Sequence, residues 1–259
     1  MKQSSIKAKK KFGQNFLKDE SVLAKIIESM PKNDNKVIEI GPGLGDLTKF
    51  LVNVKSVEAF EVDTDLCTLL QEKFQQELQT KRLSLHCGDV LEAWKGSLSD
   101  EAYDLVANLP YYIATNIILK ALADEKCHNI LVMVQREVAE KFCAAPGEKS
   151  FGALSVIAQS IARCTITQTV PPEAFDPAPK VDSAVMLLEK FQSRSDEEFE
   201  KFLRVCFKQP RKTLQKNLSE RFDKKVLGEI FVRMNLPHTV RPHQLSTDDY
   251  HQLYTLLKK

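Results

Sequence analysis

Between residues 20 and 145 the chain alternates short runs rich in β-branched residues with longer amphipathic stretches, and this alternation most limits its fold. Short strands that alternate with helices form βαβ units, whose strands lie parallel and are covered by helices on both faces. The sequence therefore predicts an α/β domain built around a mostly parallel sheet. Its expected strands are residues 37–40, 57–61, 83–86, 104–107 and 130–134.

The segments between these runs have apolar residues at the spacing of amphipathic helices. Helices are therefore expected over residues 47–54, 66–78, 116–122 and 151–162. Two later apolar runs are expected to be strands, residues 164–170 and residues 181–189, and the second is a candidate for an antiparallel strand at the far edge of the sheet. The proline-rich stretch 171–179 is expected to hold no regular structure.

After residue 193 strand-like runs stop and only helical patterns follow. These patterns cover residues 197–207, 212–222, 226–234 and 247–257. With 259 residues the chain is long enough for one large and one small domain. We expect a basic N-terminal segment over residues 1–18, an α/β domain over 19–192 and a small helical domain over 193–259.

The net charge of +2 conceals an uneven distribution along the chain. Residues 1–18 contain six lysines and no acidic residue, residues 192–259 are also basic, and the part between them is acidic. Basic ends suit contacts with a polyanion, whereas an acidic middle suits a pocket for a cationic small molecule. Solvated charged faces are the alternative interpretation of the charge pattern.

Composition narrows the class of protein. No apolar run is long enough to span a membrane, and no apolar segment follows the N-terminal lysines as it would in a secretory signal. The cysteines are scattered without a CxxC pair, so we expect reduced thiols in a cytoplasmic protein without a structural zinc site. They are Cys67, Cys87, Cys127, Cys143, Cys164 and Cys206.

The first expected strand leads directly into Gly41-Pro42-Gly43-Leu44-Gly45, and a helix follows. Glycines at this point let the backbone approach a ligand at the carboxyl edge of the sheet. The spacing differs from the G-x-G-x-x-G of dinucleotide folds, and Glu39 precedes the loop, so a cationic ligand fits better than a pyrophosphate. A tight turn without a ligand is the alternative for the loop alone.

Acidic residues stand at the ends of the next two strands. Glu61 lies twenty residues after Gly41, where a carboxylate can accept both hydroxyls of a ribose, and Asp89 could accept an adenine amino group. Taken singly, Glu61 could be a solvated strand end and Asp89 a helix N-cap. Their succession predicts S-adenosylmethionine, with its amino-acid tail at Gly41 and Gly43.

The tetrapeptide Asn108-Leu109-Pro110-Tyr111 follows the fourth strand and joins an amide to an aromatic ring. Pro110 fixes its own φ and restricts Leu109 to extended geometry, so the loop is stiff. The Asn108 oxygen and a nearby backbone carbonyl could accept the hydrogens of a purine amine, while Tyr111 stacks on an extruded base. An ordinary strand-to-helix turn is the alternative for the tetrapeptide alone.

Together these motifs resemble, in their order, those of the ribosomal RNA adenine dimethyltransferase family of the bacterial KsgA type. The marks cover most of the chain: Phe12-Gly13-Gln14-Asn15-Phe16-Leu17, the glycine loop, residues 108–111, 134–139 and 151–155, Gln159, residues 175–183 and 211–214. One departure is Asn116, where proline is expected, which leaves the start of that helix open.

The resemblance implies a Rossmann-like class I S-adenosylmethionine-dependent methyltransferase fold, with a mostly parallel seven-stranded sheet and a small C-terminal helical domain. It implies dimethylation of the exocyclic amines of two adjacent adenosines near the 3′ end of small-subunit (16S) rRNA, in ribosome biogenesis. The implied cofactor contacts are Asn15, Leu17, Gly41, Gly43, Glu61, Asp89 and Asn108. The implied catalytic set is Asn108, Leu109, Pro110, Tyr111 and Phe175, with Phe175 on the other face of the base.

Basic residues at both ends of the chain are expected to contact RNA phosphates. They are Lys9, Lys10, Lys11, Lys208, Arg211, Lys212 and Lys216. The implied partner is small-subunit rRNA within a pre-ribosomal particle, and a monomer without metal or membrane is expected. A large-subunit rRNA adenine methylase of the erythromycin-resistance type and a non-catalytic ribosome-assembly factor are the alternatives. The blocks at 151–153 and 177–180 favour the small-subunit substrate.

Overall fold

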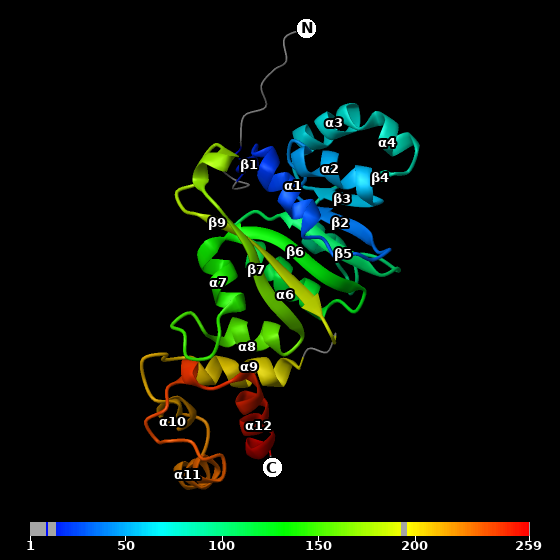
Figure 1. Cartoon of the computed structure of the whole chain (residues 1–259). Helices are drawn as coiled ribbons and strands as arrows, with labels where there is room; N and C mark the ends of the chain where they lie inside the picture. Colours follow the sequence, from blue (N-terminus) through cyan, green and yellow to red (C-terminus); the bar gives the residue numbers. More distant parts are fainter. Residues whose placement is uncertain (1–8, 10–13, 193–195, 259) are drawn as a thin grey trace. The chain divides into compact units, whose positions relative to one another are not determined.

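The computed structural model describes residue 9 and residues 14–192 and 196–258, which pack as two compact units (Figure 1). Of the described residues, unit 1 contains residue 9 and residues 14–139 and 165–192, and unit 2 contains residues 140–164 and 196–258. The domain limits drawn from the sequence stay a prediction, because packing alone does not test whether each part folds independently. In the described part of the chain, every helix is too short or too polar to cross a lipid bilayer.

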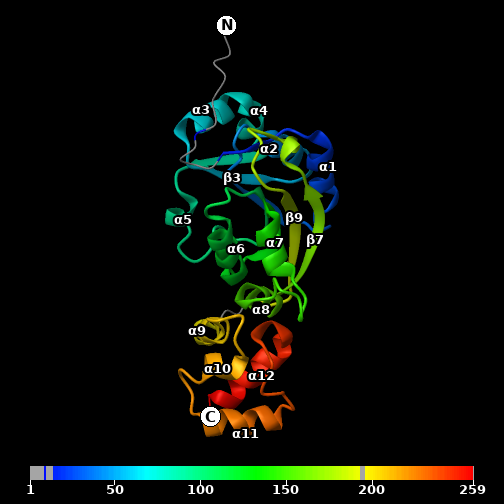
Figure 2. The same cartoon turned by 90° about the vertical axis from the view of Figure 1, so that its left-hand side faces the viewer.

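A seven-stranded sheet forms the centre of unit 1, with the strand order β4-β3-β2-β5-β6-β9-β7 (Figures 1 and 2). The strands are β2 (Lys36–Ile40), β3 (Val57–Glu61), β4 (Leu83–Cys87), β5 (Tyr103–Asn108), β6 (Cys127–Gln135), β7 (Ala162–Val170) and β9 (Ser183–Lys190). The first five strands in this order pair in parallel, and β9 pairs antiparallel with β6. The predicted fold class is confirmed, but the antiparallel strand lies inside the sheet, one position from its edge.

The order of the strands reverses at β2. The chain runs outward from β2 through β3 to β4 and then returns to β5 on the other side of β2. In doubly wound sheets, the carboxyl ends of the two strands at such a reversal border a crevice that binds ligands. Both strands are buried on both faces, as Val37, Ile38, Leu105 and Val106 show with no exposed surface. The crevice therefore has a rigid floor.

Helices cover both faces of this sheet. The helices of unit 1 are α1 (Glu20–Glu28), α2 (Asp46–Val54), α3 (Thr64–Lys73), α4 (Gln75–Gln79), α5 (Val90–Ala93) and α6 (Ala114–Ala123). The next helix, α7 (Arg136–Cys143), begins in unit 1 and ends in unit 2. Figure 2 shows α1 and α6 on opposite sides of the strands. The single helix expected over 66–78 is divided at the buried Phe74, which ends α3 and begins α4. Asn116 lies inside the first turn of α6, which begins two residues earlier.

A small second sheet pairs β1 (Phe16–Leu17) with β8 (Phe175–Asp176) in antiparallel fashion. A 3-10 turn, η2 (Pro172–Ala174), precedes β8. The expectation that residues 171–179 hold no regular structure is therefore wrong. Local patterns miss β8 because its hydrogen-bonding partner lies far away in the sequence. The Lys18 amide also donates to the Ala174 carbonyl at 2.8 Å, which ties residues 16–18 to this loop.

Two of the cysteines form a disulfide, which joins Cys67 in α3 to Cys87 at the end of β4. The expectation that all six cysteines are reduced is wrong for this pair, and the other four are free thiols. Because β3 and β4 are neighbours, the helix that follows β3 brings the two Cα atoms to 6.1 Å, within the range that a disulfide spans. Their spacing of twenty residues carries no local signal of this contact.

Unit 2 has a hydrophobic core of its own, built from helices. They are α8 (Ala153–Gln159), α9 (Glu197–Cys206), α10 (Leu214–Leu218), α11 (Lys224–Arg233) and α12 (Thr247–Leu257), with the 3-10 turn η3 (Pro242–Gln244). Phe202, Leu214, Phe231 and Tyr250 are buried in this core. The helices expected over 151–162 and 212–222 are shorter than predicted. The Gln159 amide donates to the Phe142 and Ala144 carbonyls at 3.2 and 2.8 Å, so this mark of the family has a packing role.

Candidate active site

A cleft opens in unit 1 at the carboxyl ends of β2, β3, β4 and β5. Its cavity volume is about 160 Å³. Its walls are formed by residues 14–17, 39–44, 46, 47, 60–62, 66, 88–91 and 108–113. The structure thus brings together all seven predicted cofactor residues: Asn15, Leu17, Gly41, Gly43, Glu61, Asp89 and Asn108.

The glycine loop forms the floor of the cleft with a backbone that side chains would obstruct. Gly41, Gly43 and Gly45 have φ angles of +71°, +61° and +77°, the left-handed region that favours glycine. A Cβ atom on Gly45 would lie 2.5 Å from a ring carbon of Phe74, and one on Gly43 would lie 3.1 Å from a ring carbon of Phe16. The alternative of a turn unrelated to a ligand is not favoured, because the loop lines the cleft.

Glu61 is held in a fixed orientation by two backbone amides. Its carboxylate accepts a hydrogen bond from the Asp63 amide at 2.9 Å and one from the Gly43 amide at 3.1 Å. The side chain is buried, with the whole residue 4% exposed, so the alternative of a solvated strand end is wrong. Burial raises the pKa of the Glu61 carboxyl. Each oxygen accepts one bond and retains lone-pair capacity for a ligand hydroxyl.

The cleft is acidic. Glu39, Asp46, Glu61 and Asp89 lie in its walls, and the described lining residues include no lysine, arginine or histidine. Such a site attracts a cation and repels a phosphate, so the walls fit the sulfonium and ammonium groups of S-adenosylmethionine better than a dinucleotide. Within the described ranges, no three His, Cys, Asp or Glu side chains are grouped to hold a metal ion.

Asp89 is both the N-cap of α5 and a lining residue of the cleft. It caps α5, with its carboxylate accepting from the Leu91 amide at 2.8 Å, and it also lines the cleft. The lining residues that sequence reasoning missed include Val62 and Tyr112, which are 42% and 61% exposed. Exposed apolar surface at the mouth of a cleft suits a flat ligand. Their positions, directly after Glu61 and Tyr111, were the signal that could have found them.

The Asn108 amide is oriented by the N-terminal segment. Its Nδ2 donates to the Asn15 carbonyl at 3.2 Å, which leaves Oδ1 as the acceptor end of the side chain. The next residue, Leu109, donates its amide to the Met133 carbonyl in β6 at 3.1 Å. Pro110 packs beside the glycine loop, since a Cβ on Gly41 would meet its ring at 3.6 Å. The tetrapeptide is therefore anchored to three separate segments.

Two aromatic residues of the predicted catalytic set have different surroundings. The Tyr111 hydroxyl lies 2.6 Å from the hydroxyl of the buried Ser183 in β9, which fixes the ring at the cleft. Phe175 is 5% exposed, pairs with Leu17 and belongs to the core of unit 1, and the described walls of the cleft do not include it. Its contact with a base stays a prediction, whereas Asn108 and Tyr111 share the cleft.

The basic residues expected to contact RNA differ in whether they form ion pairs within the protein. Lys9 forms ion pairs with Asp63 and Asp65, each at 2.6 Å, and Lys208 pairs with Glu220 at 2.5 Å. Lys10 and Lys11 lie outside the described residues. The remaining three are exposed on unit 2: Arg211, Lys212 and Lys216. Their role in RNA binding stays a prediction.

Glu39 is expected to make stability depend on pH. Its side chain is buried, it accepts a hydrogen bond from the Thr48 hydroxyl at 2.7 Å, and burial raises the pKa of its carboxyl from 4.5 to about 8. The folded protein therefore holds a proton that the unfolded chain releases, so this stabilisation is full below the unfolded pKa and is lost as the pH rises through about 5 to 8.

We expect the melting temperature of the ligand-free protein to fall across this window, and Glu39→Gln to flatten the profile by removing the proton. Calorimetric scans across the pH range measure both proteins. Glu101→Gln, which changes an exposed acid outside the cleft, is the control and should keep the slope of the parent. Parallel profiles for the parent and Glu39→Gln would contradict the assignment.

Comparison with known proteins places these observations in a family context. A family model described as ribosomal RNA adenine dimethylase matches residues 5–259. Ribosomal RNA small subunit methyltransferase A of Sulfurimonas denitrificans is 69% identical over 253 residues, which cover 98% of this chain and 95% of the relative.

Two solved structures share the architecture over nearly the whole chain. A dimethyladenosine transferase from Plasmodium falciparum matches with a TM-score of 0.79 at 24% identity, covering 92% of this chain and 95% of the other. The 23S rRNA methyltransferase ErmE matches with a TM-score of 0.76 at 23% identity, covering 95% of this chain and 100% of the other. At these identities both similarities show the fold alone and do not discriminate between substrates.

Proposed function

The chain belongs to the ribosomal RNA adenine dimethylase family, and from this premise we propose how its cleft performs methyl transfer. The protein is an S-adenosylmethionine-dependent rRNA adenine dimethyltransferase that acts on small-subunit rRNA. The large-subunit alternative is not favoured, because the relative with 69% identity is named for the small subunit. The observation that carries the proposal is the Asn108 amide, held by Asn15 with its oxygen as acceptor in an acidic cleft.

The acidic end of the cleft would hold the cofactor. Glu61 is oriented to accept ribose hydroxyls, Asp89 to accept the adenine amino group, and the backbone of Gly41 and Gly43 to receive the amino-acid tail. When bound, S-adenosylmethionine supplies a methyl group on a positively charged sulfur. Asn15 and Leu17 would close the opposite wall, where Leu17 is fixed by its pairing with Phe175.

The tetrapeptide would hold the target base. The Asn108 oxygen and the Leu109 carbonyl would accept the two hydrogens of the adenine amine, which favours a pyramidal nitrogen with an available lone pair. Tyr111, with its hydroxyl bound to Ser183, would stack on the extruded base. The residues thus position and desolvate the amine. We assign no general base, and the proton leaves after the transfer.

Unit 2 and the N-terminal lysines would supply the wider RNA contact. Arg211, Lys212 and Lys216 are exposed and can reach phosphates, and we extend the proposal to Lys10 and Lys11, which lie outside the described residues. We further propose that the substrate is the rRNA within a pre-ribosomal particle, met by a monomeric enzyme in the cytoplasm. Phosphate contacts should make binding weaker at high salt.

Transfer of labelled methyl groups tests the proposed function. We expect the protein to incorporate label into the rRNA of small-subunit particles that lack the modification, and not into large-subunit rRNA. Mass spectrometry of the digested rRNA should find N6-dimethyladenosine at two adjacent positions near the 3′ end. Incorporation into large-subunit rRNA would contradict the substrate. Binding to particles without cofactor binding or incorporation would support an assembly factor instead.

A further inference from the structure

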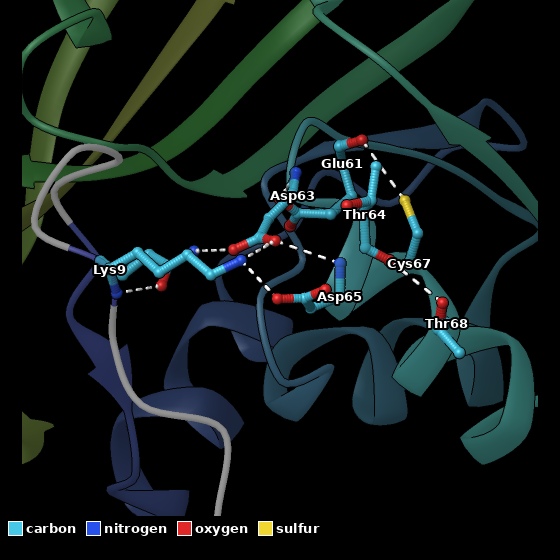
Figure 3. Close-up of polar contacts among 8 residues, drawn as sticks. Lys9, Glu61, Asp63, Thr64, Asp65, Cys67 and Thr68 are labelled. Atoms are coloured by element: carbon cyan, nitrogen blue, oxygen red, sulfur yellow. Dashed lines mark hydrogen bonds and ion pairs between the residues drawn. The ribbon is translucent and has the colours of Figure 1, made fainter.

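Asp63, two residues after Glu61, is a buried carboxylate at the centre of a polar network beside the cleft (Figure 3). Its side chain is 1% exposed. One oxygen accepts from the Lys9 ammonium at 2.6 Å and from the Asp65 amide at 3.1 Å, and the other accepts from the Gln14 side-chain amide at 3.1 Å. The Asp63 backbone amide donates to Glu61 at 2.9 Å.

This network connects two walls of the cleft that are distant in the sequence. Gln14 begins the wall formed by residues 14–17, and Gln14 also receives a bond on its side-chain oxygen from the Lys9 backbone amide at 2.7 Å. The same wall contains Asn15 and Leu17, two of the predicted cofactor contacts. On the other side, Glu61 is the predicted ribose ligand. Asp63 therefore contacts Gln14 in one wall with its side-chain carboxylate. With its backbone amide it orients the Glu61 carboxylate in the other wall.

We propose that Asp63 is a positioning residue for the cofactor, which seats segment 14–17 through Lys9 and Gln14 and orients Glu61 through its backbone. The inference rests on the proposed function for the identity of the ligand and deepens it. Asp63 would contribute to the affinity for the cofactor and little to the transfer step, because it holds walls of the cleft and does not line it itself.

Lys9 has a second acidic partner, Asp65, and a comparison of the two partners distinguishes the effect of a buried charge from that of an exposed one. Lys9 lies 2.6 Å from both Asp63 and Asp65, but the side chain of Asp65 is 65% exposed. Exposed ion pairs contribute little to stability, whereas breaking a buried pair is costly because it leaves a buried charge without its partner. Burial alone would raise the pKa of Asp63, but the bonds from Lys9, Gln14 and the Asp65 amide lower it overall. The carboxylate is thus charged where it meets Lys9.

Two substitutions break the network without removing structure around it. Asp63→Asn keeps the size of the side chain and its capping of α3, since asparagine caps helices as well as aspartate. Lys9→Met keeps the length of the side chain and removes the ammonium. For either variant we expect the Kd for S-adenosylmethionine and for S-adenosylhomocysteine to rise about tenfold, as expected for a lost charged hydrogen bond.

Kinetics and a double variant distinguish positioning from loss of structure. For Asp63→Asn the KM for S-adenosylmethionine should rise with the Kd, while kcat at saturating cofactor stays within about twofold of the parent. The double variant Asp63→Asn with Lys9→Met should bind about as weakly as the weaker single variant, because the pair is broken only once. A purely structural role would lower the melting temperature of the ligand-free protein without raising Kd.

Matched controls are Asp65→Asn and Lys36→Met. The first removes the exposed partner of the same lysine, and the second breaks a 2.8 Å ion pair with Glu58 between β2 and β3, outside the cleft. Both should bind the two ligands within about twofold of the parent. Parent-like Kd values for Asp63→Asn and Lys9→Met, or additive effects in the double variant, would overturn the inference. A parent that binds neither ligand would contradict the proposed function, and this inference with it.

Discussion

Replacing Asn108 with alanine is expected to lower the rate of methyl transfer about a thousandfold while the Kd for S-adenosylmethionine rises only a few fold. The alanine removes the oxygen proposed to accept a hydrogen of the adenine amine, an interaction that gains strength as the nitrogen becomes pyramidal. It also removes the bond to the Asn15 carbonyl, one bond of 3.2 Å, so a modest loss of cofactor affinity should accompany the change.

Single-turnover transfer to small-subunit particles lacking the modification measures the rate, and calorimetric titration measures the affinity. Asn53→Ala is the matched control, because Asn53 is exposed on α2 and its side-chain amide donates to the Lys49 carbonyl of its own helix at 2.9 Å. The control should behave like the parent. A parent-like rate in Asn108→Ala would refute the assigned role of the amide.

Replacing Glu61 with alanine is expected to weaken cofactor binding about a hundredfold or more, because two charged hydrogen bonds to ribose hydroxyls would be lost. The change also leaves the Gly43 and Asp63 amides without their acceptor, so the glycine loop should lose its fixed orientation. Calorimetric titration with S-adenosylmethionine measures the affinity. Transfer should fall in parallel at subsaturating cofactor.

Two further variants separate the loss of a ligand contact from the loss of folding. Glu61→Gln keeps the volume of the side chain and should show a smaller loss of affinity together with a melting temperature close to that of the parent. Glu58→Gln changes an acid in the same strand that pairs with Lys36 rather than with the loop, and it should bind normally. Undiminished heat of binding in Glu61→Ala would remove Glu61 from the site.

The sequence predicts the sheet well and its connections less well. Runs such as Ile130–Val134 are buried throughout, and apolarity of that kind is a local signal. The two-residue strands β1 and β8 have no such signal, because each forms only by pairing with the other, and the paired residues are 158 and 160 positions apart. The division of the helix at Phe74 was missed for a similar reason: its ring packs under Gly45, a partner outside the helical period.

The site likewise contains residues that the sequence predicts and residues that it does not. Glu61, Asp89 and Asn108 were predicted because each stands at the end of a strand, and parallel strands bring such ends to one edge. Asp63 was not singled out, since it lies in the connection between β3 and α3 and its partners Lys9 and Gln14 lie 54 and 49 positions away. A sequence motif identifies functional residues at the end of a strand. The network that orients those residues forms only when segments distant in the sequence fold together.

The absence of positive side chains among the described walls of the cleft has a consequence for repeated turnover. Each methyl transfer converts a sulfonium cation into a neutral thioether, so the spent ligand loses the attraction that Asp46, Glu61 and Asp89 exert on its precursor. Product inhibition should therefore be weak and should grow as salt screens the carboxylates. Electrostatics thus favours the replacement of the product by a new molecule of S-adenosylmethionine, which suits an enzyme that must modify the same nucleotide more than once.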